Sequence, residues 1–113
     1  MHSSQRAVCE RFGASFQASD PSLKLGLSRD ARSGAWPLHG LRHPIEGGTC
    51  GWYIWSGSPD FPADASFFEP MHVAHLEALL PEVLPYLGLP PGWRFLVAPG
   101  HADVWRDDGL LCT

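Results

Sequence analysis

The chain lacks any long hydrophobic run. No stretch approaches the roughly 20 consecutive apolar residues of a membrane-spanning helix. The first residues also lack the basic-then-apolar order of a signal peptide. We therefore expect a cytoplasmic protein that has no membrane partner.

Basic residues are also few. The 113 residues include 8 Lys and Arg against 12 Asp and Glu, a net charge of −4, and the cations are scattered. A protein that binds nucleic acid needs clustered cations to neutralise phosphates, so we expect no nucleic-acid partner. A Gly-rich phosphate loop, a nucleophile elbow and a Cys-His signature are absent from the sequence, and we predict no cofactor.

The three cysteines, Cys9, Cys50 and Cys112, show no CxxC spacing, which argues against a zinc knuckle. In a cytoplasmic protein we expect them to be free thiols. Cys50 leads into an aromatic segment, where a thiol is more often a small packing residue than a nucleophile.

What the chain does have is the composition of a globular protein, with 44% hydrophobic and 18% charged residues. Its length fits one domain. We predict a single globular domain over residues 23–113. The preceding segment, residues 1–22, carries Val8, Phe12 and Phe16 at the spacing of a short amphipathic helix.

The aromatic segment over residues 51–57 is the strongest structural signal in the sequence. Trp52 and Ile54 alternate with Tyr53 and Trp55. A strand at this place has two faces that are both costly to leave in water, because successive side chains point to opposite sides. We therefore predict a central strand.

Alternation and turn residues predict the other strands. Residues 23–28 alternate apolar with small or polar side chains. Residues 35–41 predict a short strand that Pro37 confines to an edge or a bend. A Pro-Gly turn separates predicted strands over residues 93–98 and 103–106, which should form a hairpin.

The helical part is predicted from leucine spacing. Apolar residues recur at three- and four-residue intervals from Met71 to Leu87, which predicts a helix over residues 71–80. Because Pro81 interrupts it, a short second helical segment is expected over residues 81–87. The order of elements indicates an α+β fold, with a mostly antiparallel sheet and a helix packed on one face.

His72 and His75 form a candidate metal pair. Three residues apart on a helix, both rings would lie on one face, as two metal ligands must. A third ligand would have to come from Glu69, His43, His39 or His101. The alternative is structural, with His72 packed beside the leucine stripe as a hydrogen-bonded imidazole.

Trp36 and Trp105 are the tryptophans most expected to be exposed, and exposed aromatics bind sugars or partner proteins. Arg42 and His43 lie in a loop-like context, where they either serve a ligand or hold the turn through hydrogen bonds to backbone carbonyls. The acids beside Trp105 are either solvated turn residues or a pair for acid/base chemistry. These acids are Asp103, Asp107 and Asp108.

Five ordered motifs resemble one bacterial family. They are Gly40-Leu-Arg-His-Pro44, Gly51-Trp-Tyr-Ile-Trp-Ser-Gly57, Phe68-Glu-Pro-Met-His-Val-Ala-His-Leu76, Pro81-Glu-Val-Leu-Pro-Tyr-Leu-Gly-Leu-Pro-Pro-Gly-Trp-Arg-Phe-Leu96 and Asp103-Val-Trp105. Over residues 23–107 the chain resembles the thirty-third numbered immunity-protein family of polymorphic toxin systems, long catalogued as a domain of unknown function. Two features depart from that family: Ser58 and Pro59 stand where acidic residues are expected, and residues 1–22 match nothing.

The resemblance implies a small cytoplasmic protein that is not an enzyme and that neutralises a bacterial toxin by direct binding. It assigns no catalytic residues and leaves the oligomeric state open. Partner contacts are then expected at Trp36, Arg42, His43, Trp105, Asp107 and Asp108. Two alternatives remain: a small-molecule or metal-binding protein, or even an enzyme, built on His72 and His75 with Glu69, and an aromatic module that binds glycans.

Overall fold

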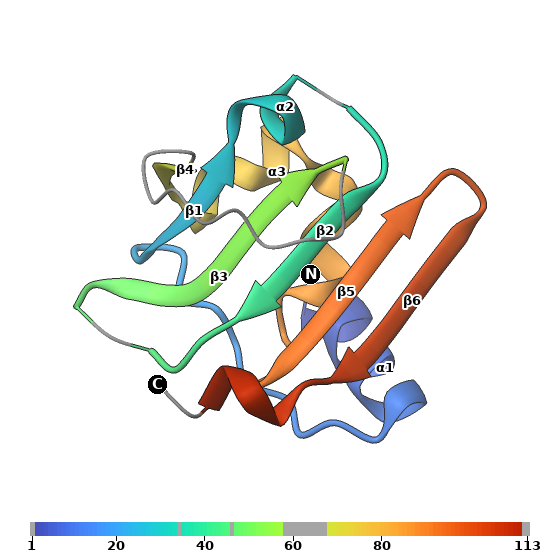
Figure 1. The fold of residues 1–113 in the computed structure, drawn as a ribbon. Helices are drawn as coiled ribbons and strands as arrows, with labels where there is room; N and C mark the ends of the chain where they lie inside the picture. Colours follow the sequence, from blue (N-terminus) through green and yellow to red (C-terminus); the bar gives the residue numbers. More distant parts are fainter. Residues whose placement is uncertain (1, 34, 46, 58–67, 112–113) are drawn as a thin grey trace.

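The computed structural model describes residues 2–33, 35–45, 47–57 and 68–111, and its centre is one six-stranded sheet (Figure 1). The strand order is β4-β1-β3-β2-β5-β6. Strands β1 and β3 are parallel, and the other neighbours are antiparallel. The strands are β1 (Lys24–Ser28), β2 (Leu38–Arg42), β3 (Thr49–Ser56), β4 (Phe68–His72), β5 (Trp93–Ala98) and β6 (His101–Arg106). The predicted α+β fold with a mostly antiparallel sheet is confirmed.

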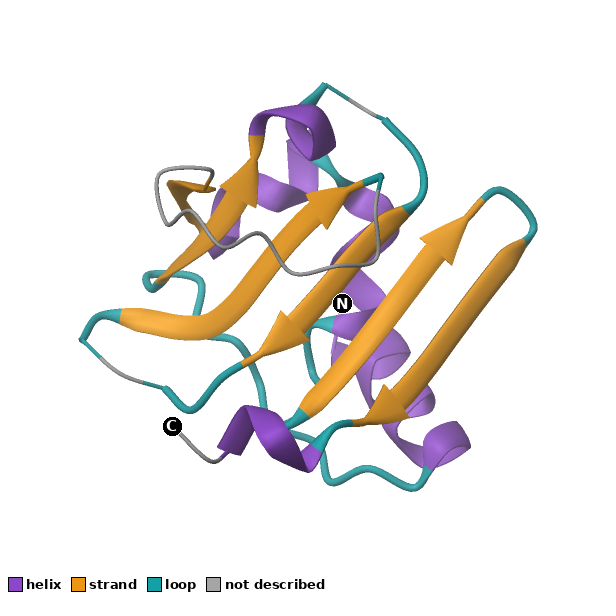
Figure 2. Ribbon diagram, viewed as in Figure 1, coloured by secondary structure: helices purple, strands orange, loops and turns teal. Residues whose placement is uncertain are grey.

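Helical segments cover one face of this sheet. Figure 2 shows helices behind the strands, among them α1 and η3, and we call this side the helical face. The helical segments of the chain are α1 (His2–Phe12), α2 (Arg29–Arg32), η2 (Val73–His75), α3 (Leu76–Leu79), η3 (Pro81–Tyr86) and η4 (Asp108–Leu111), of which η4 lies at the end of β6 and not behind the sheet. In the described ranges, no helix has the length and apolar character needed to cross a membrane.

The predicted central strand is confirmed as β3, which pairs with β1 on one side and with β2 on the other. Trp52 lies on the helical face, where its Nε1 donates to Ser19 Oγ at 3.1 Å and to the Leu87 carbonyl at 3.3 Å. Trp55 lies on the opposite face and stacks on His39, with ring centroids 5.4 Å apart. Trp52 and Trp55 are each only 1% exposed, so both faces of β3 are buried.

Strand β2 was predicted at an edge or a bend, and this prediction is wrong, because β2 pairs with both β3 and β5. Pro37 lies immediately before the first strand residue, Leu38, so it removes no N–H group from either ladder. The Pro37 carbonyl accepts a hydrogen bond from the Gly57 N–H at 3.0 Å. Proline therefore delimits this strand without exposing it. The predicted hairpin is confirmed as β5 and β6.

The predicted helix over residues 71–80 is confirmed only in part, because its helical residues are 73–79. Met71 and His72 belong to β4, an edge strand that pairs with β1. The chain then makes one 3-10 turn and one α-helical turn before Pro81. Pairing with β1 satisfies the backbone of β4, and this tertiary contact outweighs the helical spacing of the apolar residues. The expected second helical segment is present as η3.

The N-terminal helix α1 is attached to η3 on the helical face. Gln5 Nε2 donates to the Leu84 carbonyl at 3.0 Å, and Cys9 Sγ donates to the Gly88 carbonyl at 3.3 Å. Gly88 leaves room for this packing, since a Cβ there would press on the Phe16 ring and on Gln5. The first helix is therefore part of the packed core.

Gly40 should tolerate no side chain. It lies in the middle of β2 opposite Phe95, and a Cβ at this position would overlap the Phe95 ring. We expect Gly40→Ala to lower the free energy of unfolding by about 1–3 kcal/mol, the usual cost of overpacking a core. Urea denaturation followed by tryptophan fluorescence measures the loss.

The matched control is the same substitution in a Phe95→Leu background. Leucine leaves space above Gly40, so the added methyl should cost much less there, and the difference is the coupling between the two positions. An equal cost in both backgrounds would contradict the steric explanation.

Candidate functional site

The expected partner contacts do not form one surface. Because β2 runs from Leu38 to Arg42, Trp36 and His43 lie at opposite ends of this strand. Trp36 is 42% exposed in the segment before β2. Near the other end, His43 Nδ1 lies 3.4 Å from the Leu110 carbonyl oxygen, which connects it to the C-terminal turn η4. Trp36 is therefore separated from the other predicted contacts.

Arg42 is fully buried, with 0% exposure, so it cannot touch a partner directly. Its Nε donates to the Cys50 carbonyl at 2.8 Å, and its Nη1 donates to the carbonyls of Gln17 at 2.8 Å and Leu89 at 2.7 Å. Its Nη2 reaches the Ala18 carbonyl at 3.3 Å. Burial lowers the pKa of the Arg42 guanidinium below its usual value. The prediction of a partner contact is wrong here, and the structural alternative, hydrogen bonding to backbone carbonyls, is confirmed.

The C-terminal contacts gather around a residue that the sequence did not single out, Arg94. Arg94 and Trp105 are direct neighbours across the β5–β6 ladder, and the guanidinium carbon lies 5.4 Å from the Trp105 ring centroid. Arg94 Nη1 also lies 3.3 Å from Asp107 Oδ2. Alternation within β5 could have placed Arg94 on the face opposite Phe95, although not beside a tryptophan. The group that we call the Trp105 surface comprises His43, Arg94, Trp105, Asp107 and Asp108.

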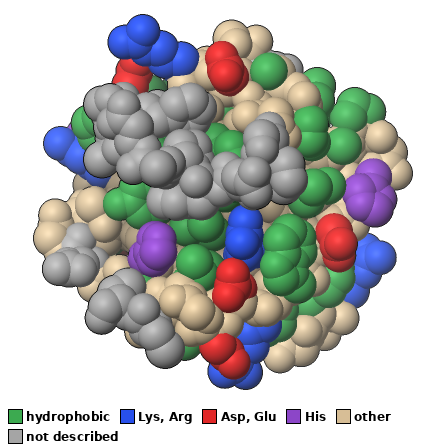
Figure 3. Space-filling view, viewed as in Figure 1, with side chains coloured by type: hydrophobic (Ala, Val, Ile, Leu, Met, Phe, Trp, Pro, Cys, Tyr) green, Lys and Arg blue, Asp and Glu red, His purple; other side chains and the backbone are tan. Residues whose placement is uncertain are grey.

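The Trp105 surface combines an exposed ring with a partly satisfied cation. Trp105 is 37% exposed, and the Arg94 side chain is 20% exposed. Within the described residues, Arg94 Nε is buried and has no hydrogen-bond partner. Figure 3 shows hydrophobic side chains beside basic and acidic ones on this face. An exposed indole stacked on an arginine has the chemistry of an interface anchor.

The two acids of this surface are held by turn and ion-pair contacts. Asp107 Oδ1 accepts a hydrogen bond from the Gly109 N–H at 3.1 Å. Asp108 Oδ1 lies 2.6 Å from Arg106 Nε, and both side chains are mostly exposed. Exposed ion pairs position side chains but contribute little stability. These contacts agree with the interpretation of both acids as solvated turn residues.

Each edge strand of the sheet has one position that cannot donate a hydrogen bond to an added strand. In a two-residue hairpin the closing pair is hydrogen-bonded, and along the ladder such pairs alternate with pairs that are not. Val104 of β6 belongs to a pair that is not hydrogen-bonded, so its N–H and C=O point away from β5. Its N–H is already bonded to Asp103 Oδ1 at 3.0 Å. The opposite edge strand, β4, contains Pro70, which has no N–H to offer. A partner is therefore more favourably bound by side chains on the faces of the sheet.

The two histidines of the candidate metal pair do not lie on one helix, which was the reason for considering them. His72 is in β4 and His75 is in η2, and their exposed rings meet edge to face with centroids 5.6 Å apart. Glu69 lies three residues from His72 in the strand, hence on the other face, where it accepts from Arg29 Nε at 2.8 Å. No group of three His, Cys, Asp or Glu side chains in the described ranges could hold a metal ion. Packing of His72 in the core, the structural alternative, is also wrong.

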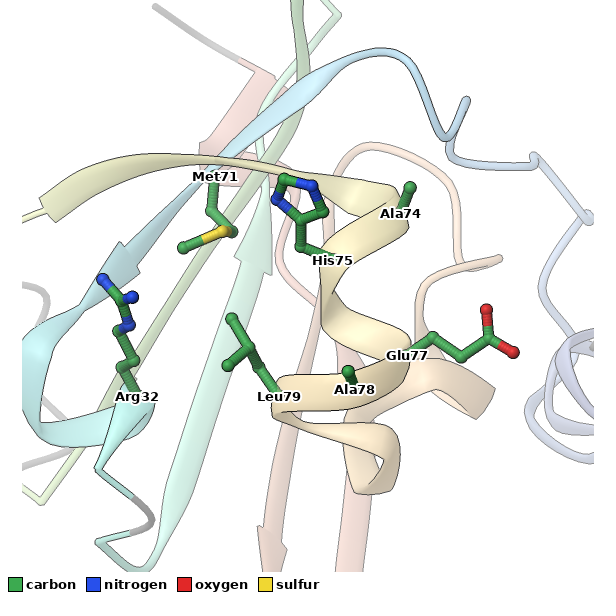
Figure 4. A pocket seen from close by; sticks show the side chains of 7 residues that line it. All are labelled: Arg32, Met71, Ala74, His75, Glu77, Ala78 and Leu79. Carbon is green, nitrogen blue, oxygen red and sulfur yellow. The ribbon is translucent and has the colours of Figure 1, made fainter.

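A hollow of about 600 Å³ opens at the β4 edge of the helical face, and we call it the α3 groove. In Figure 4, Arg32 from α2, Met71 from β4 and Leu79 from α3 converge on this hollow, whereas Glu77 points away. Sequence reasoning missed the groove because four separate elements, α2, β4, η2 and α3, form it. Its lining residues are Arg32, Met71, Ala74, His75, Glu77, Ala78 and Leu79.

The described thiols are not accessible. Cys9 and Cys50 are free and buried, at 2% and 0% exposure. Burial raises the pKa of the Cys9 thiol and of the Cys50 thiol, because a thiolate is poorly solvated in the core. Cys112 lies outside the described residues. Neither Cys9 nor Cys50 has the environment of a nucleophile.

Comparison with protein families gives a match to the Imm33-like domain over residues 4–107. The match begins in α1 and ends just after β6, so it includes the whole sheet, the α3 groove and all of the Trp105 surface except Asp108. It also extends into residues 1–22, where the sequence resemblance found nothing. No curated protein and no solved structure matches the chain.

We expect Arg42→Lys to destabilise the protein by about 3 kcal/mol, because one ammonium group cannot reach the carbonyls of several separate segments, and buried acceptors without partners are costly. Urea denaturation measures the change. The control is Arg94→Lys, which alters a partly exposed arginine with one ion pair and should cost less than about 1 kcal/mol. Equal small losses would show that the buried hydrogen bonds contribute little.

Thiol labelling should report unfolding. In a Cys112→Ser variant, a disulfide reagent at pH 8 should label Cys9 and Cys50 far more slowly in the native protein than in 6 M guanidinium chloride, since both thiols are buried and protonated. Absorbance of the released chromophore follows the reaction. Rapid labelling of either thiol under native conditions would contradict the packing described above.

Proposed function

Because the chain belongs to the Imm33-like family, we propose that it is an immunity protein that neutralises a bacterial toxin by binding it directly, without catalysis. The family match over residues 4–107 is the observation that carries this proposal. The protein would act in the cytoplasm of the cell that it protects, and its partner is a protein.

The Trp105 surface is the proposed contact with the toxin. Trp and Arg are the residue types that most often dominate binding energy, and here they are stacked before the partner arrives. Because the Arg94 guanidinium already contacts the Trp105 ring and Asp107, both side chains have less conformational entropy to lose on binding. Flanking ion pairs, from Asp107 and Asp108, give the rim a mixed charge that can orient a partner.

Trp36 lies outside the proposed contact. It is as exposed as Trp105, but it precedes β2, whereas the Trp105 surface gathers where β2 ends. Arg42 is likewise excluded as a contact by its burial. It acts through the backbone that it holds, next to His43.

Co-expression with the toxin encoded by the neighbouring gene tests the proposal. The wild-type chain should restore growth, and its complex with a catalytically inactivated toxin domain should survive gel filtration. Trp105→Ala should weaken binding by about tenfold or more, as expected for a central aromatic anchor, and should reduce protection. Calorimetry on the purified proteins gives the dissociation constants.

Trp36→Ala is the matched control, because it removes the same side chain at similar exposure from the other end of β2. The affinity of the Trp36→Ala variant for the toxin domain should stay within about twofold of wild type. A wild-type chain that neither protects nor binds would refute the immunity function. Binding that is lost in Trp36→Ala and kept in Trp105→Ala would refute the Trp105 surface.

A further inference from the structure

The α3 groove exists because the helical layer is thin at this edge of the sheet. Strand β4 is the last strand, so no further strand covers Met71, which lies opposite Leu25 of β1. The neighbouring helix α3 spans only Leu76–Leu79. Ala74 and Ala78 are the smallest side chains on the exposed part of this segment, and they leave a volume of about 600 Å³ unfilled.

The wall of the groove is apolar and adaptable. Leu79 is 37% exposed, which makes it one of the few large hydrophobic side chains left in water among the described residues. Met71 contributes a flexible thioether, a side chain that adjusts its shape to different contacts. Because the polar side chains of the lining are exposed, no buried polar group is present that would orient a small molecule. The chemistry fits an apolar side chain of a protein partner.

The charged side chain that points into the groove is positive. Arg32 reaches into it, whereas the carboxylate of Glu77 points away (Figure 4). Glu69 does not fully neutralise Arg32, because it is shared with Arg29. Glu69 Oε1 accepts a hydrogen bond from Arg29 Nε at 2.8 Å, whereas Arg32 Nη1 lies 3.5 Å from Glu69 Oε2. Half of the Arg32 side chain remains in solvent. A carboxylate beside the apolar anchor would therefore complete the ion pairing.

The groove and the Trp105 surface lie on opposite sides of the molecule. They are at opposite edges of the sheet, since β4 and β6 are the two end strands. They are also on opposite faces, since Met71 is on the helical face and Trp105 is on the other. With neighbouring strands about 4.8 Å apart, five intervals separate the two edges by about 24 Å. A protein bound at the Trp105 surface leaves the groove open.

We propose that the α3 groove is a second protein-binding site, which accepts an acidic amphipathic segment of a partner other than the toxin. One leucine or phenylalanine of that segment inserts between Met71, Ala78 and Leu79. A neighbouring Asp or Glu pairs with Arg32. Both proteins can be bound at once.

The probe is a synthetic helical peptide with leucines at three- and four-residue intervals and glutamates between them. It is titrated into the uniformly ¹⁵N-labelled full chain, without toxin, and followed by amide correlation spectra. The largest shifts are expected at the residues that line the groove. A peptide of the same design with lysines in place of glutamates should bind at least about fivefold more weakly, because it faces Arg32 with like charge.

Two pairs of variants separate groove binding from general effects. Ala78→Tyr fills the hollow and should weaken binding of the glutamate peptide by about tenfold, whereas Ala7→Tyr adds the same side chain to an exposed position of α1 and should change nothing. Arg32→Glu should abolish the preference for the glutamate peptide. Arg29→Glu removes an arginine that is bound to the same Glu69 but lies outside the groove, so this variant should still prefer the glutamate peptide.

The proposal is overturned if the largest shifts fall outside the groove, if both peptides bind equally, or if Ala78→Tyr binds like wild type. A peptide displaced by the inactivated toxin domain would also overturn it, because the two sites are proposed to be independent. The peptide titration and its variants require no toxin, so their outcomes do not bear on the immunity function.

Discussion

The structure depends on one buried cation. Arg42 leaves water completely, a transfer that costs several kcal/mol unless hydrogen bonds replace the lost hydration. Here backbone carbonyls replace it, and they come from the segment after α1, from the start of β3 and from the turn before β5. The Trp52 ring, 5.7 Å from the guanidinium carbon, adds a cation–π contact. Arg42 thereby joins segments that the sheet alone would not connect.

This role gives the most conspicuous sequence motifs a structural meaning. In Gly40-Leu-Arg-His-Pro44, Gly40 makes room for Phe95, and two residues later Arg42 points to the same side. Gly51 has a φ of +93°, and a Cβ there would collide with the His43 carbonyl, so glycine permits the close approach of β2 and β3. These motifs therefore maintain the fold. Partner recognition has to be sought in side chains that face solvent.

The sequence predicted elements whose signal is local and missed those that depend on distant partners. The alternation of Trp52 to Trp55 was enough to identify β3 as central, and the Pro-Gly turn identified the hairpin. Strand β4 was missed because its pairing with β1 joins segments forty or more residues apart, while Met71 continues the apolar helical spacing of the residues that follow. The burial of Arg42 was not predictable for the same reason: its hydrogen-bond acceptors come together only in the folded chain.

The candidate surfaces, too, could be predicted only as far as the local sequence pattern determines them. An exposed Trp105 could be predicted, but its stacking on Arg94 is a cross-strand contact that depends on the register of the hairpin. The α3 groove exists because no large side chain fills the space beside the last strand, where the helical segment is short and contributes two alanines. Both surfaces rest on backbone that the sheet and the core hold in place, and each edge strand has a position that cannot donate to an added strand. Association should therefore proceed through preformed side-chain surfaces with little change of backbone, and the two faces can be occupied independently.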